Sequence, residues 1–204
     1  LLVYLGGPDE SLWLKDLGSG DEGPLTIEGG CGEQTTCVDP MMVVLPDGGL
    51  RLYYTAAPRG VDPADGTVTT HIRSARSDDG GETWRREPGD RLSGLGLVDP
   101  DVVALPDGRW RLYNSTARWE GADPRLAVVS AVSEDGLDFT PEPGERISRI
   151  PFHHTRYIGA EAPSVTRHPD GRWWLTFNTV REPLWPENEL VARWRFWEDG
   201  VPPP

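Results

Sequence analysis

Residues 38–55 read VDPMMVVLPDGGLRLYYT, and two further stretches of the chain repeat this pattern. Residues 98–115 read VDPDVVALPDGRWRLYNS, and residues 161–178 read EAPSVTRHPDGRWWLTFN. The acidic residue near the start of one copy is followed by the next after 60 and then 62 residues. A fixed period of this kind is the signature of a repeat architecture, so each copy is predicted to belong to one structural unit.

A Pro-Asp-Gly turn divides each copy into two apolar halves, at residues 46–48, 106–108 and 169–171. Proline presets φ, aspartate hydrogen-bonds nearby backbone, and glycine accepts a positive φ. The two halves of each copy are therefore predicted to be the strands of a hairpin.

A second hairpin is predicted in the first two units, from residues 68–76 with 83–86 and from 126–132 with 139–142. The turn from Ser77 to Trp84 has the S-x-D-x-G-x-x-W pattern known as an Asp box, and residues 133–139 form a shorter version. We interpret both turns as structural: the aspartate holds the turn through backbone hydrogen bonds, and the aromatic residue packs between units.

Four short strands repeated with turn signals throughout predict an all-β fold, a β-propeller with four-stranded antiparallel blades. We expect a single propeller domain over residues 1–204, with a partial blade at 1–30 and blades at about 38–90, 98–145 and 161–204. Five such blades need more chain than this, so the propeller is expected to be incomplete. A β-sandwich is the alternative.

The charge composition of the chain indicates which binding partners to expect. The chain has 204 residues with 33 Asp and Glu against 20 Lys and Arg, a net charge of −13. A surface of that sign repels phosphate backbones and anionic lipids, so neither nucleic acid nor a membrane is an expected partner. No apolar run has the length of a transmembrane helix.

The only cysteines, Cys31 and Cys37, lie in a glycine-rich loop. A small disulfide between them and two free thiols are both open readings. The chain begins without methionine, and we expect a signal sequence or a preceding segment to be missing. The predicted location is secreted or periplasmic.

Three acidic residues open the first strand of their units: Asp39, Asp99 and Glu161. In a propeller the first strand of each blade lines the central channel, so these carboxylates are predicted to share one cavity. Carboxylates held together and partly desolvated push one another's pKa values apart, which yields a proton donor and a base near neutral pH. Glycoside hydrolysis needs that division of labour.

The sequence here resembles the five-bladed propeller glycoside hydrolases of the arabinanase and β-xylosidase type, glycoside hydrolase family 43, over roughly residues 38–180. Those enzymes carry an Asp base, an Asp that tunes the acid, and a Glu acid, each near the start of an inner strand. Val98-Asp99-Pro100 is similar to the motif of the tuning Asp, and Glu161-Ala162-Pro163 to that of the acid. The resemblance implies an oligo- or polysaccharide substrate and inversion of the sugar configuration. We expect no cofactor.

This sequence departs from the family pattern at two points. The family's base lies two blades before the tuning Asp, so Asp39, one blade before Asp99, is either a substitute base or a channel-lining residue. Aligning the two Pro residues also places Ala162, not Glu161, opposite Asp99. Because one extra residue turns a side chain to the other face of a strand, Glu161 reaches the channel only if the strand entry is irregular.

Five further residues are candidate substrate contacts. Asp101 would share the face of Asp99, and the loop leading to Glu161 contributes two side chains that suit a sugar hydroxyl or carboxylate. Two tryptophans are placed in loops after a second strand, where an indole stacks on a sugar ring or anchors the loop. The candidates are Asp101, His154, Arg156, Trp119 and Trp185.

Two other functions stay open. A propeller that only binds carbohydrate or protein would also place these residues in its channel. Sialidase-like chemistry needs several arginines around the channel, and Arg156 and Arg181 alone do not supply them. No ligand spacing specifies a metal site, although carboxylates facing one axis would suit a structural Ca²⁺ ion.

Overall fold

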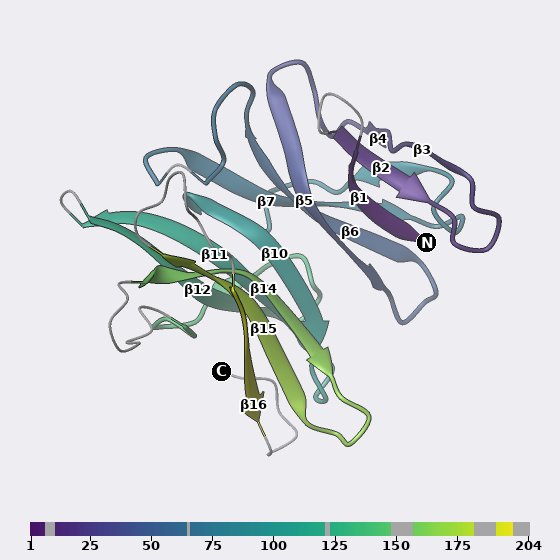
Figure 1. Cartoon of the computed structure of the whole chain (residues 1–204). Coiled ribbons are helices and arrows are strands. Elements are labelled where there is room, and N and C mark those ends of the chain that lie inside the picture. Colours follow the sequence, from purple (N-terminus) through teal and green to yellow (C-terminus); the bar gives the residue numbers. More distant parts are fainter. Residues whose placement is uncertain (7–10, 65, 121–122, 148–156, 182–190, 198–204) are drawn as a thin grey trace.

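The computed structural model describes residues 1–6, 11–64, 66–120, 123–147, 157–181 and 191–197, and these residues contain strands and turns but no helix. Figure 1 shows the strands gathered into successive sheets along the chain. The expected all-β class is confirmed. No helix long and apolar enough to cross a membrane occurs in this part of the chain.

The N-terminal half forms two sheets. The first is a small antiparallel sheet of β1 (Leu2–Gly6), β2 (Ser11–Lys15) and β3 (Glu22–Pro24). The second is built around an antiparallel β5-β6-β7-β8 core, with β4 added parallel to β8 and β9 paired with β7. Its strands are β4 (Ile27–Glu28), β5 (Thr35–Val44), β6 (Leu50–Pro58), β7 (Thr69–Ser77), β8 (Trp84–Arg86) and β9 (Leu92–Leu95).

The C-terminal half contains two units joined in one sheet, the first of β10 to β13 and the second of β14 to β16. Their bounds are β10 (Leu97–Ala104), β11 (Trp110–Glu120), β12 (Asp123–Ser133), β13 (Thr140–Pro141), β14 (Tyr157–Arg167), β15 (Trp173–Arg181) and β16 (Val191–Trp197). One parallel pair, Leu126 with Gly159, links the units. A Cβ at position 159 would lie 1.8 Å from the Leu126 carbonyl oxygen, so this approach requires glycine.

The Pro-Asp-Gly turns have the same geometry in all three units. In the first, Leu45 N donates to Gly49 O at 2.8 Å and Asp47 Oδ1 accepts from Gly49 N at 3.0 Å. The turn glycines have φ values of 88°, 91° and 91°. The predicted hairpins β5-β6, β10-β11 and β14-β15 are therefore confirmed, with the residue chemistry that suggested them.

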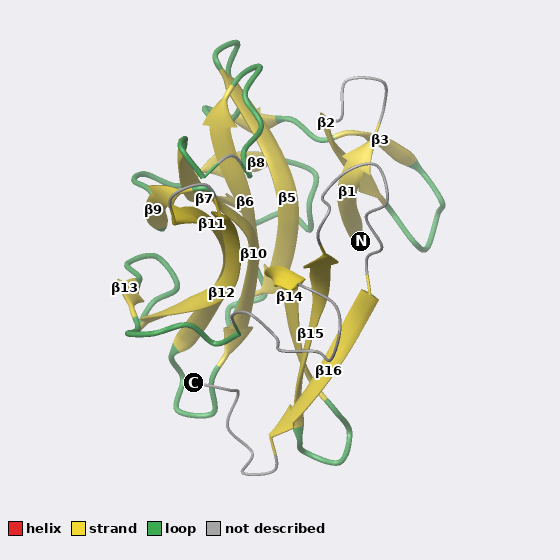
Figure 2. Cartoon of the chain, turned by 60° about the vertical axis from the view of Figure 1, so that its left-hand side comes forward, coloured by secondary structure: helices red, strands yellow, loops and turns green. Residues whose placement is uncertain are grey.

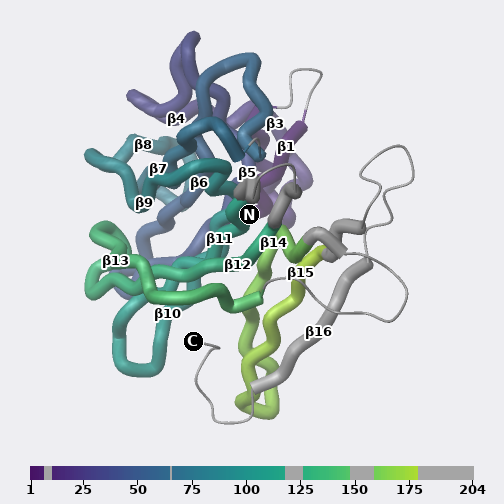
Figure 3. The backbone as a smooth tube through the Cα atoms, turned by 90° about the vertical axis from the view of Figure 1, so that its left-hand side faces the viewer, coloured from purple at the N-terminus to yellow at the C-terminus, as the bar shows by residue number. Residues whose placement is uncertain are grey.

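The apolar core is divided among three clusters, and each lies between successive units. Tyr53 and Tyr54 show how: both side chains are fully buried, but they point to opposite faces of β6. Tyr54 packs with Leu12 and Trp84 towards the N-terminal sheet, whereas Tyr53 packs with Val102 of β10. The next cluster joins Tyr113 of β11 to β14 and β15. Figures 2 and 3 show the sheets following one another in chain order.

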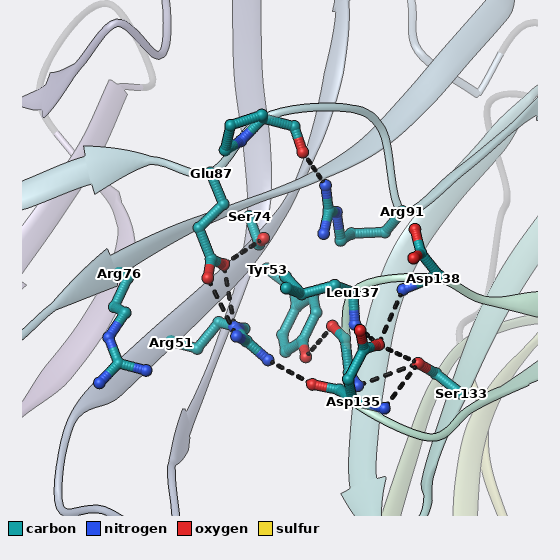
Figure 4. A network of polar contacts seen from close by, with 12 residues as sticks. Arg51, Tyr53, Ser74, Arg76, Glu87, Arg91, Ser133, Asp135, Leu137 and Asp138 are labelled. Carbon is teal, nitrogen blue, oxygen red and sulfur yellow. Dashed lines mark hydrogen bonds and ion pairs between the residues drawn. The ribbon is translucent and has the colours of Figure 1, made fainter.

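The turns with the Asp-box pattern are held by side chain to backbone hydrogen bonds. Asp79 accepts from Thr83 N at 2.9 Å and from the Thr83 hydroxyl at 2.6 Å. In the next unit Asp135 accepts from Leu137 N and Asp138 N. This second turn also contacts the preceding unit, because Tyr53 Oη donates to Gly136 O at 2.8 Å (Figure 4).

The aromatic residues of these turns pack as expected. Trp84 is 3% exposed, and Phe139 meets the ring of Tyr53 edge-on at a centroid distance of 6.2 Å. Trp110 and Trp173, in strands β11 and β15, are also buried. These rings belong to the packing between units.

Candidate active site

The first strand of each unit has an irregular entry at the same place. Strands β5, β10 and β14 each shift register against their partner strand, between Val38 and Met41 in β5 and at the corresponding positions in the other two. In each case two residues face one on the partner, which is the definition of a β-bulge. The first bulge residue has a positive φ: 53° at Asp39, 52° at Asp99 and 48° at Ala162.

These φ values settle which residues correspond to one another. Ala162 takes the place of Asp39 and Asp99, as the alignment of the proline residues suggested. Glu161 instead pairs with Asn178, in the position where Val98 pairs with Ser115. The irregular entry that Glu161 was predicted to need is present, directly after it in the chain.

The bulges of successive units are joined by hydrogen bonds to carboxylates. Asp39 Oδ2 accepts from Asp99 N at 3.4 Å, and Asp99 Oδ2 accepts from Ala162 N at 3.1 Å. The Ser115 hydroxyl accepts from the same Ala162 amide at 2.8 Å. Each aspartate therefore holds the strand entry of the following unit, and the contact of Asp99 lies one residue from Glu161. Strands β5 and β14 both contact β10.

Burial and mutual repulsion perturb the carboxylates of this site. Burial, with a contribution from the charge of Asp99, raises the pKa of Glu161 to about 7. The same two causes raise the pKa of Asp39 to about 6, against a favourable contact with the Thr55 hydroxyl. Burial raises the pKa of Asp99 as well, but the Ser115 hydroxyl and the Ala162 amide stabilise its charged form. The site thus combines a carboxyl whose pKa lies near neutral pH with a neighbour whose negative charge favours its protonated form.

Asp101 is buried between two units. Only 7% of the residue is exposed, and its Oδ2 accepts a 2.6 Å hydrogen bond from Val165 N on β14. Asp99 also accepts a hydrogen bond from β14, so the two aspartates reach the same neighbouring strand. Asp101 therefore lies in the packing between two units instead of on an open substrate face.

Of the four remaining candidate contact residues, only Trp119 lies within the described residues. His154, Arg156 and Trp185 are outside the described residues. Trp119 is near the end of strand β11, paired with Pro124, and not in a loop as expected. The hairpin is longer than predicted because the pairing of β11 with β12 continues to Glu120 and Asp123.

Sequence reasoning missed the polar partners supplied by the second strand of each unit. Thr55 and Ser115 occupy the same position on β6 and β11, each next to the aspartate of its own unit. Their signal was visible in the repeat, because both copies end in a hydroxyl residue after an aromatic or amide one.

The repeated arginines were also missed, and they serve the outer packing. Arg51 pairs with Glu87 and Arg111 with Glu142, each at 2.9 Å with little side-chain exposure. These two arginines are therefore engaged away from the candidate carboxylates, and Arg156 lies outside the described residues while the side chain of Arg181 is not described. Among the residues that the structure describes, no group of three or more His, Cys, Asp or Glu could hold a metal ion.

The chain matches no protein-family model, and no curated protein matches it in sequence. Its structure is similar to an endo-arabinase from Bacteroides thetaiotaomicron, with a TM-score of 0.60 and 18% identity, over 94% of this chain and 67% of that one. It is also similar to a family 117 glycoside hydrolase from Zobellia galactanivorans, with a TM-score of 0.63 and 15% identity, over 83% and 55% of the two chains. It is similar as well to a thermostable family-43 glycoside hydrolase, with a TM-score of 0.58 and 18% identity, over 81% of this chain and 56% of that one.

These likenesses define the fold as a β-propeller of the kind found in glycoside hydrolases. The propeller prediction and the resemblance are confirmed at that level, and the β-sandwich alternative is set aside. The chain spans between about half and two thirds of the length of these structures. The number of blades stays a prediction.

Proposed function

We propose that the protein is a glycoside hydrolase that cleaves an oligo- or polysaccharide with carboxylates from the first strands of its blades. Glu161 is the general acid, Asp99 orients and tunes it, and Asp39 is the base. The observation that carries this assignment is the placement of Glu161 beside Asp99, where burial and the charge of Asp99 raise the pKa of Glu161 to about 7. A general acid is most effective when its pKa lies near the working pH.

The proposed reaction follows from these protonation states. Glu161 gives its proton to the oxygen of the leaving sugar while the bond from that oxygen to the anomeric carbon breaks. A water molecule attacks the same carbon, and Asp39 accepts a proton from that water. The charge of Asp99 raises the pKa of Glu161, so Asp99 favours the protonated form of the proposed acid. The acid and base exchange protons with solvent before the next turnover.

Loss of the acid can be separated from loss of the fold by the choice of substrate. In E161A, hydrolysis of native polysaccharide should fall at least 100-fold, because a sugar leaving group needs a proton. An aryl glycoside with a good leaving group should lose much less activity. E82A, at an exposed residue, is the matched control and should leave both activities unchanged. Equal activity of E161A and the native protein on both substrates would remove Glu161 as the acid.

The stereochemistry of the product tests the role of Asp39. A base that activates water gives inversion and stands about 6.5–9.5 Å from the acid, whereas a nucleophile gives retention and stands about 5–5.5 Å away. We expect inversion, which ¹H NMR of the first-formed anomer would report.

A propeller that binds a glycan without cleaving it is the second candidate. The observation in its favour is that Asp39 and Asp99 each engage a backbone amide of the next unit, which is a structural use of a carboxylate. The two candidates differ in one measurement, the release of reducing ends from a bound glycan. A protein that only binds would retain the glycan and release no reducing ends, and its D99N variant would release none either.

We also propose that the protein acts outside the reducing cytosol, as a secreted or periplasmic protein. Cys31 and Cys37 form a disulfide, with 5.8 Å between their Cα atoms. Disulfides persist in oxidising compartments. Thiol titration of the denatured protein from its native source should find no free thiol at these cysteines, and two free thiols would contradict the proposal.

A further inference from the structure

One buried carboxylate has no part in the proposed reaction. Asp101 lies on β10, two residues after Asp99, and directly contacts β14 of the next unit. Its partner there is the amide of Val165, which donates to Oδ2 at 2.6 Å. Burial raises the pKa of Asp101 to about 7, so the carboxylate stands in a place that disfavours its charge.

Two carboxylates of β10 together hold both sides of the β14 bulge. Asp99 accepts from the amide of Ala162, the residue after Glu161, and Asp101 accepts from the amide of Val165, the residue after Ser164. The register shift of β14 lies between Glu161 and Ser164. The backbone that determines the direction of Glu161 is thus fixed at one end by Asp99 and at the other by Asp101.

The preceding unit shows that the fold does not require this second contact. Met41 occupies the corresponding position on β5, where it faces Tyr53 as Asp101 faces Tyr113. A methionine side chain accepts no strong hydrogen bond from the next strand. The second carboxylate is therefore specific to the one interface that carries Glu161.

We propose that Asp101 is a positioning residue, which with Asp99 clamps the β14 bulge and fixes the orientation of the Glu161 side chain. This inference rests on the proposed function for its consequence in catalysis. Either protonation state of Asp101 retains an oxygen that accepts from Val165 N, so the clamp needs an acceptor and not a charge. The charge of Asp99 raises the pKa of Glu161, so Asp99 both tunes the proposed acid and clamps the bulge, whereas Asp101 serves only as a clamp.

Two substitutions separate the acceptor from the side-chain volume. D101N keeps an oxygen that accepts from Val165 N, and D101M reproduces the residue found at position 41. We expect D101N to retain kcat within about 3-fold, and D101M to lose 10- to 100-fold in kcat with little change in KM, since misplacing a catalytic group costs about this much. The pH profile of D101N should match that of the native protein, unlike that of D99N. An unchanged kcat in D101M, or an equal loss in both variants, would overturn the proposal.

Amide hydrogen exchange tests the clamp without any activity. In D101M the amide of Val165 should exchange at least 10-fold faster than in the native protein, and in D101N it should not. If D101M does not fold, the exchange of Val165 in D101N decides: protection equal to the native protein supports the acceptor role, and lost protection overturns it. A native protein that cleaves no glycan would end the proposed function but leave this measurement to decide on the clamp.

Discussion

Removing Glu87 should destabilise the protein far more than removing a surface glutamate that makes an equally short ion pair. Arg51 Nη2 donates to Glu87 Oε1 at 2.9 Å, and the Arg51 Nε lies 2.9 Å from Oε2 (Figure 4). The Ser74 hydroxyl donates to the same carboxylate at 2.6 Å. The side chains of Arg51 and Glu87 are 6% and 14% exposed, so E87A would leave a buried guanidinium without its counter-charge.

The expected loss is about 3–5 kcal/mol of unfolding free energy, the usual cost of removing one partner of a buried ion pair. Arg51 keeps one acceptor, the carbonyl oxygen of Asp135 in the next unit at 3.1 Å, which places the loss towards the lower end. Because a domain of this kind is stable by only about 5–15 kcal/mol, such a loss is a large share of the total.

The surface pair of Lys15 and Glu22 is the matched control. The Lys15 Nζ lies 2.7 Å from the Glu22 carboxylate, but the side chains are 38% and 45% exposed, so E22A should lower the unfolding free energy far less than E87A. Urea unfolding followed by tryptophan fluorescence would measure both variants. Equal losses in E87A and E22A would refute the claim that burial, and not contact length, sets the value of these pairs.

Three further predictions concern the strand entries and turns. D99N removes the charge that raises the pKa of Glu161, so the pKa should fall below about 7; since the proposed acid works only when protonated, the alkaline loss of kcat/KM should begin at lower pH, and an unmoved profile would separate Asp99 from the proposed acid. A162G should keep the fold and raise stability by up to about 1 kcal/mol in urea unfolding, because glycine accepts the φ of 48°; a loss would mean that the alanine is not strained there. D79A should lower the urea midpoint of unfolding by less than E87A does and leave kcat unchanged, because the Asp79 carboxylate holds only the turn; a fall in kcat at unchanged stability would give that turn a catalytic role.

The repeat could be predicted from the sequence because its turns depend on local chemistry. Pro46-Asp47-Gly48 and its two counterparts fix a hairpin through φ preferences and one short-range hydrogen bond, which need no knowledge of the rest of the chain. The Asp-box turn is equally local, since Asp79 and its partner Thr83 are four residues apart. Strands placed from these turns were found close to their expected bounds.

Contacts between units could not be predicted from the sequence in the same way. Asp101 and Val165 are 64 residues apart, and only the curvature of the sheets brings them together. The pairing of Arg51 with Asp135 spans 84 residues and depends on the docking of one turn on the preceding unit. The burial of Asp101 likewise depends on a strand from a distant part of the chain.

Glu161, half-buried beside Asp99, is expected to hold a proton near neutral pH. Titration of the Glu161 carboxyl carbon by ¹³C NMR, assigned by the signal that disappears in E161Q, measures this directly and needs no substrate. We expect a midpoint near the value of about 7, to which burial and the charge of Asp99 raise the pKa of Glu161. A midpoint near the 4.5 of an ordinary glutamate would contradict it.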